Sequence, residues 1–238
     1  MGDAMKRLPI VDVLRGLAVV AMVVYHFAWF ANEGGLVDLP VRRSTGWHVF
    51  QRSIASTFFV LVGVSLHLSC GRGVRWRPFA RRLARVLGGA AVVTGVSLVL
   101  DPRRAVVFGI LHCIAACSVL VLPVLRLPSV AVVGLGLAWV ALAQVGGLAA
   151  FDTPWLHWTG LSPQVPPTFD LQPLFPWMGV VMLGVVVARW LETQAWAAAP
   201  VTAPVPGALA MVGRHSLLFY MGHVPVLVGI VALLLALR

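Results

Sequence analysis

Long apolar segments dominate this chain and constrain its fold more than any other feature. Of its 238 residues, 60% are hydrophobic and only 11% are charged, whereas a soluble domain has about 25% charged residues. So little charge cannot cover a globular surface in water, and an apolar helix needs roughly 20 residues to cross a bilayer. The sequence therefore predicts an all-α, polytopic membrane protein, a single transmembrane domain over residues 1–238 with a bundle of about seven helices. The expected spans are about 10–31, 51–70, 83–100, 106–125, 129–149, 173–191 and 214–236.

The breaks between these spans differ in character. Residues 151–173 read "FDTPWLHWTGLSPQVPPTFDLQP", which is too irregular to cross a membrane, although its tryptophans suit the membrane interface. Residues 192–207, "ETQAWAAAPVTAPVPG", are typical of a flexible linker. Pro123 and Pro128 in "LPVLRLPS" indicate a tight turn between the fourth and fifth spans, because proline cannot continue a helix.

Arginine is concentrated in the loop "GRGVRWRPFARRLAR" at residues 71–85. Because loops rich in Lys and Arg stay in the cytoplasm, this loop is expected there, and counting spans places the N-terminus there too. We therefore expect an integral protein of a bacterial-type cytoplasmic (inner) membrane, in contact with the lipid bilayer. The net charge of +10 does not indicate a nucleic-acid partner, since the arginines lie between apolar spans rather than on one soluble face. By the same count the cytoplasmic side also holds Arg126, Arg189 and Arg214, whereas Arg42, Arg43, Arg103 and Arg104 fall outside.

The first span, "VDVLRGLAVVAMVVYHFAWF", contains three ionisable side chains: Asp12, Arg15 and His26. Eleven steps separate Arg15 from His26, and at about 100° and about 1.5 Å per residue the two share one helix face, roughly 16 Å apart. Asp12 precedes Arg15 by three residues, so their side chains can pair. Two interpretations stay open. In the first, the polar face formed by Arg15 and His26 is functional, as intramembrane ionisable groups tend to be. In the second, Arg15 reaches the lipid headgroups and His26 bonds to a neighbouring helix.

Four further polar residues occupy comparable places: Arg52, His112, Asp170 and His223. Arg52 opens the second span, His112 lies within the fourth, Asp170 precedes the sixth and His223 lies in the last. Each also has a structural interpretation. Arg52 could be an interfacial arginine, His112 a helix-packing histidine and Asp170 a capping carboxylate. For His223, the structural role is to satisfy the backbone carbonyl that Pro225 frees.

Motifs of soluble enzymes are missing from the sequence. It has no phosphate-binding Gly-rich loop, no HExxH and no GxSxG in a strand–helix setting, and its eight Asp and Glu residues are too few and scattered for a two-metal site. No metal is therefore expected, and any chemistry must depend mainly on histidine. A histidine can take a proton from an attacking amine or hydroxyl while an arginine holds donor phosphates, which permits acyl transfer. His67, beside the basic loop, is expected to be structural.

Five segments carry a resemblance to a known family: "RLPIVDVLRGLAVVAMVVYHFAWF", "FQRSIASTFFVLVGVSLHLS", "FGILHCIA", "DLQPLFPWMGVVMLG" and "GRHSLLFYMGHVPVL". In this order they resemble the bacterial relatives of the heparan-alpha-glucosaminide N-acetyltransferase catalytic domain, within a wider class of transmembrane acyltransferases. That class often shows an Arg-Gly near the start of its first helix and a histidine at the outer end, which match Arg15 and His26. This chain is much shorter than the lysosomal member, and residues 32–46 contain no histidine.

The resemblance implies acetyl-CoA as a cytosolic co-substrate and a sugar acceptor on the other side of the membrane. The expected function is transfer of the acetyl group to an amine or hydroxyl of a sugar or envelope glycan. The residues assigned to this function are His26, Asp12 and Asp170 as catalytic candidates, Arg15 and Arg52 for the donor, and His112 and His223 for the acceptor. His26 would act as the general base and Asp12 would orient Arg15.

Two other classes of function are compatible with the same residues. Buried His, Asp and Arg side chains could form a proton relay in a proton-coupled small-molecule transporter. Helices broken at Pro123, Pro176 and Pro225 could flank its substrate site, although no internal repeat is evident. A non-catalytic membrane scaffold is the third class, and it would not need buried ionisable groups.

Overall fold

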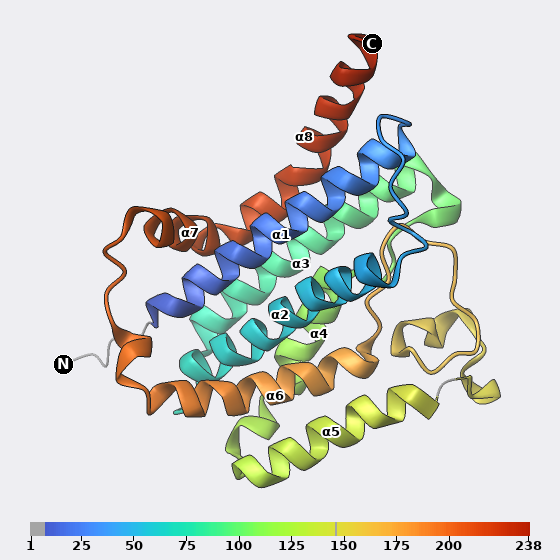
Figure 1. Cartoon of the computed structure of the whole chain (residues 1–238). Coiled ribbons are helices and arrows are strands. Elements are labelled where there is room, and N and C mark those ends of the chain that lie inside the picture. Colours follow the sequence, from blue (N-terminus) through green and yellow to red (C-terminus); the bar gives the residue numbers. More distant parts are fainter. Residues whose placement is uncertain (1–7, 146) are drawn as a thin grey trace. The chain divides into compact units, whose positions relative to one another are not determined.

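The computed structural model describes residues 8–145 and 147–238, and within these ranges every regular element is a helix (Figure 1). The prediction of an all-α protein is therefore confirmed for the described residues. The α-helices are α1 (Pro9–Glu33), α2 (Thr45–Cys70), α3 (Trp76–Leu100), α4 (Ile110–Leu120), α5 (Ser129–Val145), α6 (Leu174–Glu192), α7 (Pro204–Arg214) and α8 (Ser216–Ala236). Short 3-10 helices are η1 (Pro102–Arg104), η2 (Pro123–Arg126), η3 (Ala149–Phe151), η4 (Pro154–Thr159) and η5 (Ala195–Ala198).

Among the described residues, 5 helices are long and apolar enough to cross a membrane, namely α1, α2, α3, α6 and α8. The expected spans 106–125 and 129–149 correspond to shorter helices, of 11 residues in α4 and 17 in α5. At about 1.5 Å per residue, α4 reaches only about half the roughly 30 Å of a hydrocarbon core. The expected count of about seven spans is therefore not confirmed.

The expected linker at residues 192–207 is only partly irregular. Helix α7 begins at Pro204 and continues to Arg214, so the prediction of a flexible linker is wrong from residue 204 onward. Proline is well accommodated in the first turn of a helix, where its missing N–H has no helical partner to lose. The short apolar run that follows then packs on α1 rather than remaining in solvent.

The chain divides into two compact units. Residues 59–194 form one, which we call the central unit, and residues 8–58 with 195–238 form the other, which we call the terminal unit. The helix α2 contributes its first part to the terminal unit and its second part to the central unit. Each unit has a core and candidate site residues of its own.

In the terminal unit, α1 lies along α7 and also contacts α8 (Figure 1). Two glycines bring the backbones of α1 and α7 into direct contact, because a Cβ atom on Gly16 would collide with the backbone of Leu209 and one on Gly213 with the backbone of Asp12. Apolar packing continues from Val19 and Met22 to the adjoining part of α2. Small residues of this kind allow the close approach on which helix association in lipid depends.

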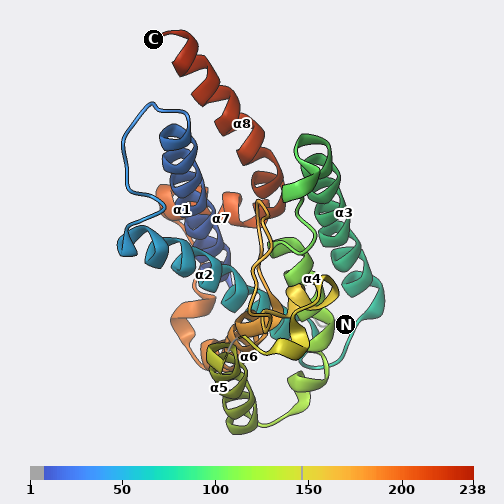
Figure 2. The same cartoon turned by 90° about the vertical axis from the view of Figure 1, so that its right-hand side faces the viewer.

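The central unit has the larger core, built from α2, α4 and α6. Phe59 stacks on Trp177 with ring centroids 4.8 Å apart. The backbones of α2 and α6 meet at Gly63 and Gly184, and α5 lies along α6 (Figures 1 and 2). The helices α2, α4 and α6 also carry the polar side chains of His67, His112 and Glu192.

The glycine contact between α1 and α7 can be tested with two substitutions on the same helix. We expect Gly213→Ala to lower the free energy of unfolding by about 1–3 kcal/mol, since the added methyl group must displace the α1 backbone. A Cβ atom on Gly207 would meet nothing within 4 Å, so Gly207→Ala should be neutral or stabilising by up to about 1 kcal/mol. Thermal unfolding of both variants in detergent measures the difference, and equal midpoints would contradict the contact.

Candidate functional site

A pair of histidines joins α1 to α8 in the terminal unit. The ring centroids of His26 and His223 lie 4.8 Å apart, with the rings inclined at 63°. His223 is buried, at 8% relative exposure, and His26 is half-buried. The sequence predicted His26 as the base and His223 as a residue that binds the acceptor. Their direct contact depends on the tertiary structure.

Each histidine ring is oriented by a carbonyl of its own helix. The Nδ1 atom of His26 lies 2.9 Å from the carbonyl oxygen of Met22, and Nδ1 of His223 lies 2.6 Å from that of Tyr220. Because a carbonyl oxygen only accepts, each Nδ1 carries the hydrogen, and in the neutral ring Nε2 keeps the basic lone pair. The Nε2 atom of His223 is buried and has no hydrogen-bond partner among the described residues. In each ring, Nε2 is therefore the nitrogen that is not bonded to its own helix.

The carbonyl that accepts the hydrogen bond from His223 is not the one that Pro225 was expected to leave without a donor. Pro225 cannot donate to the carbonyl one helical turn before it, that of Met221. His223 bonds instead to Tyr220. The His223 ring is therefore oriented by its own helix, and this hydrogen bond does not satisfy the Met221 carbonyl.

The other end of α1 carries an ion pair. Nη1 of Arg15 lies 3.0 Å from Oδ1 of Asp12, and both side chains are 22% exposed. The pairing expected from their spacing is present, and it points the guanidinium along α1. The close contact of Gly213 with the Asp12 backbone places α7 beside this end of the helix.

Arg52, the second donor candidate, is exposed on α2. It makes no ion pair with the residues that the structure describes. Its assignment to the donor stays a prediction.

In the central unit, His112 and Asp170 meet at the start of α4. Oδ2 of Asp170 accepts a hydrogen bond from the Ile110 N–H at 2.9 Å, across 60 residues of sequence, and Oδ1 accepts from Nε2 of Gln172 at 3.2 Å. A side chain on Gly109 would collide with this carboxylate. Asp170 therefore caps α4, where the unpaired N–H groups and the helix dipole favour a negative charge.

The two ring nitrogens of His112 are both engaged. Nδ1 accepts from the Gly109 N–H at 3.3 Å, and Nε2 lies 3.3 Å from Oγ1 of Thr94. That hydroxyl donates its own hydrogen to the Val106 carbonyl at 2.7 Å, so the imidazole Nε2–H is the donor to it. A role for His112 in binding the acceptor stays a prediction, and it requires one of these bonds to exchange.

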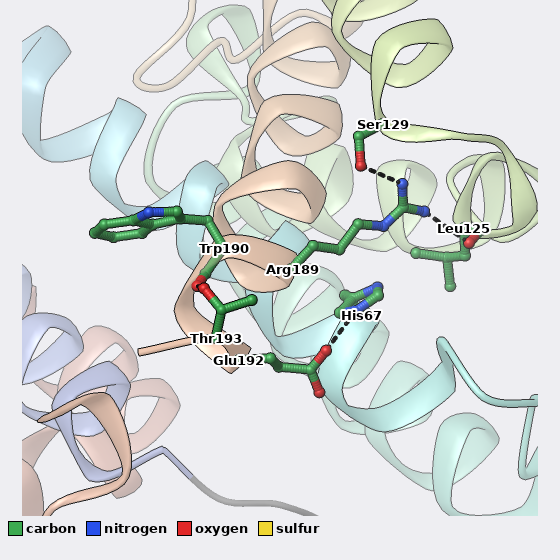
Figure 3. Close-up of polar contacts among 7 residues, drawn as sticks. All are labelled: His67, Leu125, Ser129, Arg189, Trp190, Glu192 and Thr193. Carbon is green, nitrogen blue, oxygen red and sulfur yellow. Dashed lines mark hydrogen bonds and ion pairs between the residues drawn. The ribbon is translucent and has the colours of Figure 1, made fainter. Parts of the chain in front are cut away.

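A third polar cluster was not anticipated from the sequence. Nε2 of His67 lies 3.2 Å from Oε2 of Glu192, and on the same turn of α6 the Arg189 guanidinium donates to the Leu125 carbonyl at 2.9 Å and to Oγ of Ser129 at 3.0 Å (Figure 3). His67 was expected to be structural, and a contact with Glu192 between two packed helices agrees with that role; the partner itself, 125 residues away, was not anticipated. No local spacing signals such a pair, because only the packing of α2 on α6 brings the two together. Among residues 8–145 and 147–238, no three His, Cys, Asp or Glu side chains are arranged to hold a metal ion.

Comparison with known proteins identifies the class and then the family. Residues 7–225 match a family of membrane acetyltransferases, so this chain is an integral membrane protein of the acetyltransferase class. The family is described as "Heparan-alpha-glucosaminide N-acetyltransferase, catalytic", and the chain belongs to it. Membership of this family, expected from the five sequence segments, is thereby confirmed. Neither the curated proteins nor the solved structures include a match.

The burial of Asp170 at the start of α4 predicts that the stability of the fold depends on pH. Burial raises the pKa of the Asp170 carboxyl, and the hydrogen bonds from Ile110 and Gln172 oppose this rise. A raised pKa in the folded state means that this group stabilises the fold most at low pH, and that the contribution declines as pH rises from the ordinary carboxyl value through the raised one. Asp170→Asn should abolish this decline while keeping an acceptor for Ile110, whereas Asp170→Ala should destabilise by about 1–3 kcal/mol because the Ile110 N–H loses its partner.

Thermal unfolding of the wild type and both Asp170 variants between pH 4 and 8 measures these effects. The conservative variant also separates capping from catalysis. If Asp170→Asn keeps its stability but loses acetyl transfer, the carboxylate has a chemical role. If Asp170→Ala is as stable as the wild type, the capping interpretation is wrong.

Proposed function

We propose that this membrane acetyltransferase moves an acetyl group from cytosolic acetyl-CoA to an amine or hydroxyl of a sugar or an envelope glycan. One observation carries the proposal: the contact between His26 and His223, each with its Nδ1–H held by its own helix and Nε2 left as the basic nitrogen. Family membership supplies the reaction type. The acetyl donor and the acceptor are inferred from the family and from the types of side chain present.

In this mechanism His26 is the general base. Its Nε2 takes the proton from the acceptor amine or hydroxyl as that atom attacks the thioester carbonyl of acetyl-CoA. A new C–N or C–O bond forms, the C–S bond breaks, and the proton passes from the imidazolium to the CoA thiolate. His223, whose Nε2 is buried without a partner, accepts a hydrogen bond from the acceptor and orients it against His26. Close positioning of the reacting groups replaces an entropically costly encounter.

The donor is assigned to the opposite end of α1. There the Arg15 guanidinium, fixed by its 3.0 Å ion pair with Asp12, offers paired N–H donors to a phosphate. Arg52 is the second donor-binding candidate. Consistent with the arginine-rich loop at 71–85, we place the N-terminus in the cytoplasm and the protein in a bacterial-type inner membrane.

Asp170 is retained as a catalytic candidate and His112 as a candidate for binding the acceptor. Their contacts stabilise the start of α4 within the central unit. For the proton-coupled carrier, family membership provides no support. Substrate uptake into proteoliposomes without acetyl-CoA would be the observation in its favour.

The base assignment predicts a large and selective loss of activity. We expect His26→Ala to lower the rate of labelled acetyl transfer in membranes by about 100-fold or more, since general-base catalysis typically contributes that much. His223→Ala should reduce it less and should mainly raise KM for the acceptor. If His26→Ala folds normally and keeps full activity, His26 is not the base.

His48→Ala is the matched control for these variants. His48 is an exposed histidine of α2 in the same unit, so its removal should leave acetyl transfer within about twofold of the wild type, as is usual for surface substitutions. A comparable loss in His48→Ala would mean that the assay reports general disturbance of the unit.

The donor assignment predicts a different kinetic signature. Arg15→Gln should raise KM for acetyl-CoA about tenfold or more, because charge-assisted hydrogen bonds to phosphate are lost. Asp12→Asn should change KM in the same direction but by less, since it only releases the guanidinium. Arg43→Gln, which removes an exposed charge from the same unit, is the control. An unchanged KM in Arg15→Gln would rule out the donor role.

A further inference from the structure

The first turns of α3 carry exposed arginines that none of the sites above uses. Arg77, Arg81 and Arg85 are spaced four residues apart, and the side chains of all three are exposed. Residues with this spacing lie on one face of a helix, each about one turn from the next. We call these three residues the α3 arginine face.

Packing of α3 on the central unit fixes the direction of this face. Phe79 is buried in the core of the unit, and Leu83 packs against that core. At about 100° per residue, Phe79 lies about 160° around the helix axis from both Arg77 and Arg81. The core therefore holds one side of α3, and the α3 arginine face points away from the unit.

The positive charge of this face has no acidic residue near it in the sequence. No Asp or Glu occurs between Asp38 and Asp101, and no ion pair formed among the described residues includes a member of the α3 arginine face. Like charges four residues apart on a helix repel one another, and positive charges near a helix N-terminus oppose the helix dipole. An anion outside the chain would relieve both unfavourable interactions.

The length of α3 places the arginines at the height of the lipid headgroups. Arg81 lies about 28 Å along the helix axis from Leu100, at about 1.5 Å per residue, and the hydrocarbon core is roughly 30 Å thick. When Leu100 lies at one boundary of the core, Arg81 therefore lies at the other. Arg77 is one turn farther out, among the headgroups, and Arg85 can extend its guanidinium toward them from one turn deeper. The Trp76 ring, 66% exposed, suits the same interface.

We propose that the α3 arginine face binds anionic phospholipids of the leaflet in which α3 begins. Lipid phosphates accept charge-assisted hydrogen bonds from arginine, and they are available at the height of Arg77 and Arg81. A net negative headgroup is required, because the attraction of basic residues to a membrane surface comes from its anionic lipids. This binding goes beyond the proposed acetyl transfer and does not depend on His26.

Selective retention of anionic lipid by the full chain tests this proposal. The protein is reconstituted in nanodiscs that contain phosphatidylglycerol and phosphatidylcholine in equal amounts and with the same acyl chains. Native mass spectrometry then counts the lipids that stay bound to the released protein. We expect phosphatidylglycerol to be retained about fivefold or more over phosphatidylcholine. Equal retention of the two lipids by the wild type would overturn the proposal.

The variants decide whether the α3 arginine face is responsible. We expect Arg77→Gln/Arg81→Gln to lower the ratio of retained phosphatidylglycerol to phosphatidylcholine about threefold or more. Arg43→Gln/Arg103→Gln removes the same charge from two exposed arginines outside the face, and its ratio should stay within about twofold of the wild type. Equal losses in both double variants would overturn the proposal in favour of attraction by net charge.

A charge-preserving variant and a stability measurement cover a double variant that misfolds. Arg77→Lys/Arg81→Lys keeps both positive charges, so it should retain at least about half of the wild-type lipid ratio. A loss as large as that of the glutamine variant would contradict an electrostatic role. Thermal unfolding shows whether a variant has lost its fold, and the wild-type ratio tests the proposal without any variant. These measurements report lipid binding, so their failure and the failure of the His26 activity test are distinguishable.

Discussion

Close backbone contact between helices, made possible by glycine, is the constraint on which the terminal unit depends. Lipid tails are as apolar as leucine, so burial of apolar surface does little to hold helices together in a bilayer, and close packing must serve instead. Gly16 and Gly213 let the backbones of α1 and α7 touch. The Gly16 of the "LRG" segment thus has a packing role of its own beside Arg15. With α1 held in this way, α7 covers the Asp12 end and the His26 ring reaches His223 of α8.

Polar groups in each unit are arranged according to the cost of leaving them unpaired in apolar surroundings. Asp170 satisfies a helix start, His112 bridges a loop to Thr94, and Arg189 supplies hydrogen bonds to a turn. In each case these hydrogen bonds account for the half-buried position of the side chain. His223 differs from these three, because its buried Nε2 has no partner among the described residues, a property that it shares with Nδ1 of His67 and Nε1 of Trp139. What His223 adds is its contact with a second imidazole, that of His26, and the proposed reaction uses this contact.

Several features could be predicted from local pattern. The long helices follow from runs of apolar residues, and the Asp12–Arg15 pair follows from a three-residue spacing within one helix. The prediction failed where local pattern is ambiguous. The apolar run at 106–125 begins with a non-helical segment whose Val106 is bonded to Ser97 and Thr94, so α4 begins only at Ile110. The region around Pro204 looks like a linker by composition, but its short apolar face is stabilised by packing on α1.

By itself the sequence determined that this is an all-α membrane protein of the acetyltransferase class, because hydropathy and motif order depend only on residues close together in the chain. Only the tertiary structure decided the pairing of side chains far apart in sequence. Three examples depend on how the helices pack: the contact of His26 with His223, the capping of α4 by Asp170, and the bond of His67 to Glu192. Helix packing is set by shape and by close backbone approach, which no local spacing encodes.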